Sequence, residues 1–444
     1  MKLFKFIAPG MVALLSTIAI NAQNDSTLNF SLLDAQNYAI DNYYLSLNAA
    51  KDIESAEKKI WETTAIGLPQ VSTNGEYQRY LDDEIPSMTF PDFENSPDPT
   101  NPELMDIAIF QRENFSYGGN VSQLIFSGEY IVGLQASKVY KLLSEENYEK
   151  IKIDLRETIA GTYYTLLILA ENKRVITETL DNLYMNLEHS RKTFEVGLIE
   201  DIDVDQLELT VKRTENDLKS IDNQIETMNR MLKYQLGLSS SVNVILTDNL
   251  TELLAVNIIS DSAYTFILED HIDYRMLATQ ENLQELSLNR EKTKYLPEIN
   301  GFYNYMGNTN ASAFTPPQHL VGVKANWTIF QSGLRSAKIA QEKIALEQAQ
   351  NVKEQESERL ILVAQQAKYD YQTALARYLN EETNFELSKK VFDKTTKRYK
   401  EGFVSSLDLS IVNNQYLGAQ LSFAIAIQDL LTTKVALDKA YSRL

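Results

Sequence analysis

Three short motifs occur twice in this chain, and each second occurrence lies the same distance from the first. The repeated residues, each pair 205 positions apart, are Gly128 and Gly333, Gly197 and Gly402, and Asp203 and Asp408. A constant offset across three motifs indicates an internal duplication. A duplicated chain folds into two similar units, and this constraint limits the architecture more than any other feature of the sequence.

Each copy predicts the same order of elements: a helix ending at a Leu-Pro pair, two strands, a long helix, a glycine turn and a shorter helix. The predicted helices are 31–66, 129–192 and 202–236 in the first copy and 263–295, 334–395 and 407–441 in the second. We expect the first repeat at 23–236, a linker of short elements at 237–262 and the second repeat at 263–444. An acidic, proline-rich insert at 82–114 predicts an exposed loop between the two strands of the first copy.

Proline is confined to a few places in the chain. Residues 103–296 and 318–444 contain none, so long uninterrupted helices are possible there. Apolar residues in 360–378 recur every three or four positions, which indicates an amphipathic helix. At about 1.5 Å per residue, the helix 129–192 spans about 96 Å and each shorter helix about 50 Å. Two short helices placed end to end match one long helix, which predicts a tall antiparallel bundle.

Four segments alternate between apolar and polar residues, as strands with one apolar face do. They are 71–81, 115–126, 299–307 and 320–330. Their length is close to the roughly 9–11 residues of a tilted membrane strand. A membrane sheet must close on itself, and known barrels have about 8 strands or more. Four strands per chain therefore predict an oligomeric barrel, although alternation alone also fits an ordinary half-buried sheet.

Residues 1–22 predict a signal peptide. Lys2 and Lys5 precede an apolar stretch, and Ala22 precedes the expected cleavage site. No later segment is apolar over the roughly 20 residues of a membrane-spanning helix. The mature protein is therefore expected either to be soluble or to cross a membrane as β-strands.

The composition argues against several classes of function. The chain has 42 Lys and Arg against 61 Asp and Glu, a net charge of -19, whereas a nucleic-acid-binding protein needs a basic surface. It has no Cys, which removes disulfides and thiol catalysis. Its three His residues are widely spaced, so we expect no metal site and no cofactor. No catalytic cluster stands out, and we do not expect an enzyme.

The duplicated order resembles the TolC-like outer-membrane efflux family of Gram-negative bacteria over residues 31–441. The resemblance rests on Ala35 through Leu68-Pro69, Leu296-Pro297, the elements 124–128 and 329–333, and the turn motifs 194–203 and 399–408. It implies a long antiparallel α-helical barrel in the periplasm, continuous with a trimeric 12-stranded β-barrel in the outer membrane. It also implies a passive exit duct of a tripartite efflux or type I secretion system. The implied partners are two further copies, outer-membrane lipid, a periplasmic adaptor (membrane fusion) protein and an inner-membrane RND or ABC transporter.

The resemblance also implies roles for individual residues. The channel entrance would include Asp203, Asp408 and Tyr399. The two helix-turn tips that meet the adaptor would be Val196-Gly197-Leu198 and Gly402-Phe403. Pro69 and Pro297 would mark the junctions between helices and strands, and Trp327 would lie at the membrane interface.

Some positions depart from the family pattern. Val404 stands where some members hold the entrance closed with an Arg, and Ile411 stands where a second acidic ring is expected. Lys397 and Arg398 are alternative basic partners, and the extra acids Glu200, Asp201 and Asp205 lie at the first tip. Each repeated Asp is also a candidate N-cap, because it lies close to a predicted helix start.

Two other functions remain open on the sequence. One is an exported structural coiled-coil protein with a soluble sheet. The other is an exported enzyme that uses paired carboxylates, as glycosidases do.

Overall fold

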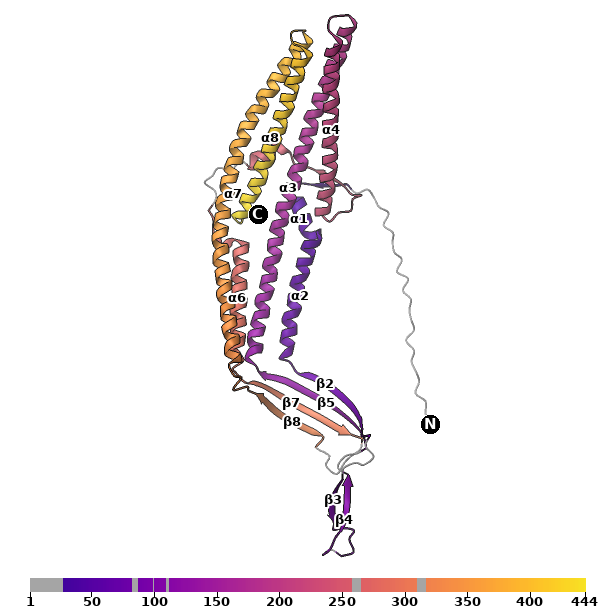
Figure 1. The fold of residues 1–444 in the computed structure, drawn as a ribbon, viewed down its shortest axis with the longest axis vertical. Coiled ribbons are helices and arrows are strands. Elements are labelled where there is room, and N and C mark those ends of the chain that lie inside the picture. Colours follow the sequence, from indigo (N-terminus) through magenta and orange to yellow (C-terminus); the bar gives the residue numbers. More distant parts are fainter. Residues whose placement is uncertain (1–26, 82–86, 99, 109–111, 258–264, 310–316) are drawn as a thin grey trace, which may run out of the picture.

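The computed structural model describes residues 27–81, 87–98, 100–108, 112–257, 265–309 and 317–444. The predicted signal peptide at 1–22 lies outside these residues. The molecule is narrow and elongated, with a long helical part, a sheet that bends away from it, and a hairpin beyond the sheet (Figure 1).

Two long helices run the full height of the helical part (Figure 1). They are α3 (Gly128–Glu195) and α7 (Leu334–Lys400), with 68 and 67 residues. On α3 pack α2 (Tyr44–Ile66) and α4 (Asp201–Gln235), and on α7 pack α6 (Ile272–Thr293) and α8 (Ser406–Ala440). The predicted pairing of one long helix with two short ones is confirmed in both halves of the chain.

Local chemistry decides where these helices begin and end. Ser127 accepts a hydrogen bond from the Tyr130 amide (3.3 Å) and so caps the start of α3. The helices α2 and α6 end shortly before Pro69 and Pro297, neither of which can continue a helix. A strand begins at the residue after each proline. The two prolines therefore lie where the sequence places them, between helix and strand.

The four predicted strands form one antiparallel sheet in the order β2-β5-β7-β8. The strands are β2 (Gln70–Arg79), β5 (Glu113–Phe126), β7 (Glu298–Asn308) and β8 (His319–Asn326). One row across all four strands is apolar: Val71, Val121, Tyr303 and Val321. The next row is polar in three strands, at Ser72, Asn120 and Asn304, and ends at Leu320. The alternation in each strand is thus combined into one apolar and one mostly polar face of a single sheet, and within the described residues β2 and β8 each pair on one side only.

The last strand is shorter than the predicted 320–330. It ends at Asn326, and the indole Nε1 of Trp327 then donates to the carbonyl of Tyr295 (3.0 Å) at the end of the α6 segment. Ile329 and Phe330 lie beyond the strand and are strongly exposed.

The insert 82–114 is not only a loop, so that expectation was wrong. It contains a β-hairpin of β3 (Ser87–Asp92) and β4 (Glu103–Ala108), separate from the main sheet. Met88 pairs with Ile107 and Phe90 with Met105, so alternating apolar residues lie on one face of the hairpin. The alternation is short and interrupted by acidic residues and prolines, which is why composition alone predicted a loop.

The first predicted helix, 31–66, is also not continuous. It is divided into α1 (Leu32–Asn42) and α2 by Tyr43, whose backbone is extended (φ −76°, ψ 134°). The end of α4 approaches this break so closely that a Cβ on Gly237 would lie 2.5 Å from the Asn42 carbonyl oxygen. The break therefore lies at a tertiary contact with a segment almost 200 residues away.

The linker contains the short elements that the sequence predicts. These are β6 (Asn243–Leu246) and α5 (Leu250–Asn257). The parallel pairing of β6 with β1 (Thr27–Phe30) was not predicted. The Tyr163 hydroxyl of α3 donates to the Phe30 carbonyl (2.9 Å), which attaches this small sheet to the middle of the bundle.

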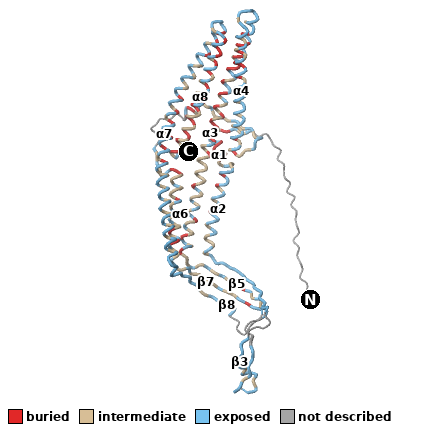
Figure 2. The backbone as a smooth tube through the Cα atoms, viewed as in Figure 1, coloured by how far each residue is buried: buried red, intermediate tan, exposed pale blue. Residues whose placement is uncertain are grey.

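Buried residues gather on the facing sides of the helices, and the sheet is mostly exposed (Figure 2). One apolar cluster lies around the middle of the bundle and includes Tyr163, Leu232 and Leu430, all fully buried. A second cluster lies towards the far ends of α3, α4, α7 and α8 and includes Leu183 and Leu409. The helical part thus has its own core, whereas the sheet has none within a single chain.

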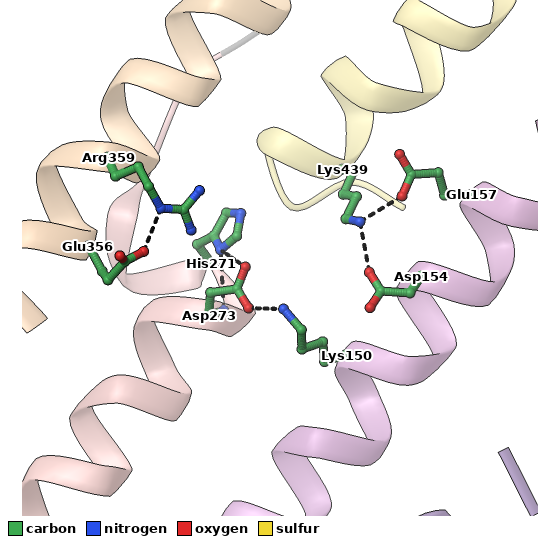
Figure 3. A network of polar contacts seen from close by, with 8 residues as sticks. All are labelled: Lys150, Asp154, Glu157, His271, Asp273, Glu356, Arg359 and Lys439. Carbon is green, nitrogen blue, oxygen red and sulfur yellow. Dashed lines mark hydrogen bonds and ion pairs between the residues drawn. The ribbon is translucent and has the colours of Figure 1, made fainter. Parts of the chain in front are cut away.

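A polar network lies where the end of α8 meets the start of α6 (Figure 3). Lys439 of α8 bonds Asp154 (2.7 Å) and Glu157 (2.6 Å) of α3, and Lys150 of α3 pairs with Asp273 of α6. A cation at a helix C-terminus and an anion at a helix N-terminus both complement the helix dipole. The network therefore holds two helix ends against the continuous helix α3.

Candidate functional site

The two predicted tips are turns of the same construction. In the first, between α3 and α4, the Gly197 amide bonds the Phe194 carbonyl (2.8 Å) and the Leu198 amide bonds the Thr193 carbonyl (3.1 Å). In the second, between α7 and α8, Gly402 bonds Tyr399 (3.0 Å) and Phe403 bonds Arg398 (2.9 Å) in the same pattern. Both are Schellman motifs, which end a helix by satisfying its last carbonyls.

The backbone conformation of the two turns favours glycine, whereas a lack of space for a side chain does not. Gly197 has φ 77° and Gly402 has φ 78°, and no atom lies within 4 Å of a Cβ built on either. Left-handed backbone of this kind favours glycine. The glycines therefore shape the turns, while contact with a partner would fall to their neighbours.

Those neighbours are large, apolar and exposed. Leu198 is 76% exposed, Phe403 70% and Val196 69%. Each turn thus presents apolar side chains at the end of the bundle, and such groups mark interaction surfaces when they gather at one place.

The repeated aspartates lie in the first turns of α4 and α8, but neither is the N-cap. Glu200 precedes α4 without a side-chain cap, and Ser405 caps α8. Asp408 lies three residues after Ser405, whose hydroxyl donates to the Asp408 carboxylate (2.8 Å). The N-cap alternative for Asp203 and Asp408 was wrong, because each helix begins three residues earlier than that role requires.

Ser406, which the sequence analysis did not single out, joins the two tips. Its hydroxyl contacts the Asp203 carboxylate and lies 3.1 Å from Oε1 of Gln206, both on α4. Ser406 is 1% exposed. One turn further on, the hydroxyls of Thr210 and Ser410 lie 3.0 Å apart. No motif signals such a contact, because it depends on how two helices 200 residues apart are packed.

Tyr399 is buried, unlike the other predicted entrance residues. It is 8% exposed and belongs to the apolar cluster near the tips. Burial raises the pKa of its hydroxyl. A cavity of about 360 Å³ lies beside it, and its lining includes His189, Asp203 and Asp408. Tyr399 and both aspartates therefore border one space at the tip of a single chain, and their entrance role stays a prediction.

The predicted junction and membrane-interface residues lie at the other end of the bundle, whereas the basic pair lies at the second tip. Trp327 follows β8 and is 60% exposed, near the junctions marked by Pro69 and Pro297. Lys397 and Arg398 lie in the last turn of α7.

Two general properties concern the described residues as a whole. None of the helices described is both long enough and apolar enough to cross a membrane. Across the same residues, no group of three or more His, Cys, Asp or Glu side chains is arranged to hold a metal ion.

The sequence matches the outer membrane efflux protein family over residues 46–238 and 268–442, which is most of the chain. The chain belongs to the outer membrane efflux protein family. The two matched ranges correspond to the two halves of this efflux protein, in agreement with the duplication seen in the sequence.

The fold of this efflux protein is that of solved outer-membrane channels. It is similar to CusC, with a TM-score of 0.74 at 15% identity over 95% of both chains. It is similar to the Campylobacter jejuni channel CmeC, with a TM-score of 0.72 at 16% identity over 92% of this chain and 85% of that one. For the open state of the Neisseria gonorrhoeae channel MtrE, the TM-score is 0.68 at 14% identity over 92% and 88%. No curated protein matches the sequence.

The family and the fold together show where in the cell this efflux protein lies. It is mostly helical, with a periplasmic helical tunnel that continues into β-strands in the outer membrane of a Gram-negative bacterium. Its family consists of channels and not of enzymes. The alternative of an exported structural coiled-coil protein is not favoured.

Proposed function

We propose that this efflux protein is the passive exit duct of a tripartite efflux or type I secretion system. Residues 1–22 direct its export, three copies form one continuous channel, and an adaptor and an inner-membrane transporter of the RND or ABC class open it at the tips. It performs no chemistry, and the transporter supplies the energy.

The observation that carries the proposal is the sheet. Its apolar row runs across all four strands and is exposed, with Val71 at 78% and Val321 at 79%. In a bilayer, unpaired edges such as those of β2 and β8 cannot be left open. Pairing β2 of one copy with β8 of the next closes the sheet, and three copies give twelve strands with room for a channel.

The tips support the entrance role. Apolar Leu198 and Phe403 are exposed at the far end of the helices, where an adaptor would dock. Asp203 and Asp408 lie in the first turns of α4 and α8, close to these tips. Three-fold symmetry would bring six such carboxylates around one axis, and a ring of negative charge attracts cations.

Reconstitution in a planar bilayer tests the proposal. We expect the purified protein to run as a trimer and to conduct, with a multivalent cation such as hexaamminecobalt blocking from the side of the tips. Asp408→Asn removes the charge and keeps an acceptor for the Ser405 hydroxyl. We expect it to weaken the block about tenfold, which corresponds to about 1.4 kcal/mol.

The matched control is Asp217→Asn, an exposed aspartate about four turns beyond Asp203 along α4. Its block should equal that of the wild type. A monomer that never conducts contradicts the duct, whereas a conducting trimer with unchanged block for Asp408→Asn removes only Asp408 from the entrance.

A further inference from the structure

A groove of about 860 Å³ lies where the helices meet the sheet. Its floor is the first part of α3, and its walls are α2 and α6, which flank α3 above the sheet (Figure 1). The strands close its end with Gln70 of β2, Ser122 of β5 and Asn300 of β7. The volume falls within the roughly 300–1,000 Å³ of small-molecule sites.

The groove opens on the side of the sheet that faces away from lipid. Side chains alternate between the two faces of a strand. Gln70, Ser122 and Asn300 therefore share a face with the polar row that begins at Ser72. The exposed apolar row that begins at Val71 belongs to the other face, which is the lipid face of a membrane sheet. The groove is thus open to the inside of the duct.

Small residues keep the floor of the groove low. Gly133 and Ala136 of α3 line it together with Ala56 of α2. Gly133 lies inside a helix, where glycine is destabilising, and no atom lies within 4 Å of a Cβ built on it. Packing within the chain therefore does not require this glycine, and a larger side chain at its position would fill the groove.

The charged side chains of the lining leave a free carboxylate. Lys59 is neutralised from outside the groove, because its Nζ lies 2.8 Å from both carboxylate oxygens of Glu62. The Nε of Arg290 lies 3.9 Å from the carboxylate of Glu129. Asp52 makes no hydrogen bond or ion pair with any other described residue. The groove therefore favours a ligand with a positive charge.

Apolar and aromatic side chains complete the lining. Ile66 of α2 is 57% exposed and Tyr140 of α3 is 51% exposed, and Leu283 of α6 lies on the opposite wall. The face of an aromatic ring attracts cations. A carboxylate beside apolar and aromatic groups suits an organic cation that also has an apolar part.

We propose that the groove holds amphipathic organic cations in transit between the helical tunnel and the barrel. Asp52 is the counter-ion, and Tyr140 and Ile66 contact the apolar part of the ligand. This site rests on the duct function proposed above and adds a class of substrate to it.

Binding of rhodamine 6G, an amphipathic organic cation, to the detergent-purified trimer tests the site by fluorescence anisotropy. We expect Asp52→Asn to weaken binding about fivefold, the upper range for an exposed charge pair. Gly133→Leu should abolish binding, because the new side chain occupies the groove. The anionic dye fluorescein should not bind.

Two matched controls test whether these effects belong to the groove. Asp217→Asn removes an equivalent charge from α4, and Gly161→Leu replaces another glycine of α3 that has no atom within 4 Å of its Cβ position. Neither residue lines the groove, so both variants should bind rhodamine 6G as the wild type does. Asp408→Asn should also bind normally, although it weakens the block by hexaamminecobalt.

Cysteine labelling locates the bound dye without filling the groove. The chain has no Cys, so Ser55→Cys places a single thiol in the lining. Rhodamine 6G should slow the reaction of this thiol with a maleimide and leave the reaction of Lys219→Cys on α4 unchanged. This measurement remains decisive where Gly133→Leu does not assemble.

Failure of the site and failure of the duct are distinguishable. A wild type that forms no conducting trimer refutes the duct itself. A conducting trimer refutes the site alone if Asp52→Asn and Gly133→Leu bind the dye normally and the thiol at position 55 is not protected. Equal binding of fluorescein refutes the preference for cations.

Discussion

At the scale of the residue, Ser406 shows how one side chain connects distant parts of the chain. It lies at the start of α8 and contacts Asp203 and Gln206 of α4. The two glycine turns shape each tip separately, but Ser406 links the two tips of one chain by a side-chain contact. Without it, the half-buried acceptors Asp203 and Gln206 of α4 lose a donor.

We expect Ser406→Ala to destabilise the tips by about 1 kcal/mol, because a hydrogen bond to half-buried acceptors on α4 is lost. Hydrogen exchange should quicken around residues 203–210 as well as at the start of α8. Ser405→Ala is the matched control: it removes the α8 cap, costs about 1 kcal/mol, and should affect only the second tip. Equal effects of both variants on α4 would show that Ser406 does not couple the tips.

At the scale of the element, the junction of α6 and α8 depends on His271. Its ring Nδ1 accepts a hydrogen bond from the Asp273 amide (3.2 Å) and so caps α6. The residue is 6% exposed, and burial is the main cause that lowers its pKa below 6.5, with Lys150, Lys439 and Arg359 acting in the same direction and Asp273 opposing them. Only the neutral ring can accept this bond.

The lowered pKa gives a defined pH dependence. Below pH 6.5 the unfolded chain takes up a proton at His271 that the folded chain resists, so folded stability falls as pH falls. His271→Asn keeps a capping side chain that does not titrate. We expect the melting temperature of the wild type to drop more than that of His271→Asn between pH 7 and pH 5.5. Parallel curves for the two proteins would contradict this assignment.

At the scale of the whole molecule, the hairpin β3–β4 is an addition and not part of the barrel wall. The ladder of β2 and β5 ends at Arg79 and Glu113, and among the described residues the hairpin strands pair only with each other. Its residues therefore extend beyond the strands that copies must share in order to close the sheet.

We expect replacement of residues 82–111 by a short glycine-containing turn to leave assembly unchanged. The variant should keep the heat stability of the wild-type trimer on gels, because no pair of the four-stranded sheet is removed. As a control, removal of residues 117–122 from the middle of β5 should abolish assembly. Loss of the trimer in the first variant would mean that the hairpin takes part in the contact between copies.

Much of the architecture was predictable because it depends on short-range chemistry. Proline ends α2 and α6, glycine allows the left-handed backbone at Gly197 and Gly402, and alternating polarity marks the four strands. The features that the sequence did not predict have a different physical origin. The break at Tyr43, the pairing of β1 with β6 and the hairpin in the insert depend on packing between distant segments or on patterns too short to recognise.

The candidate site, too, was predictable only in part. The positions of both tips and of Asp203 and Asp408 followed from repeated motifs, and the apolar residues at positions 404 and 411 were visible as departures. Neither the burial of Tyr399 nor the role of Ser406 could be predicted, because both depend on which sides of α3, α4, α7 and α8 meet.

The sequence by itself determined the duplication, the lengths of the helices and the two faces of the strands, since each of these is encoded by the spacing of residues along one segment. Only the tertiary structure decided which face of each helix is covered. The spacing of Leu407, Ile411, Leu421 and Ile425 along α8 is the same whether these side chains are buried or exposed. Only the packing of the other helices on the opposite side of α8 leaves them exposed in the described chain.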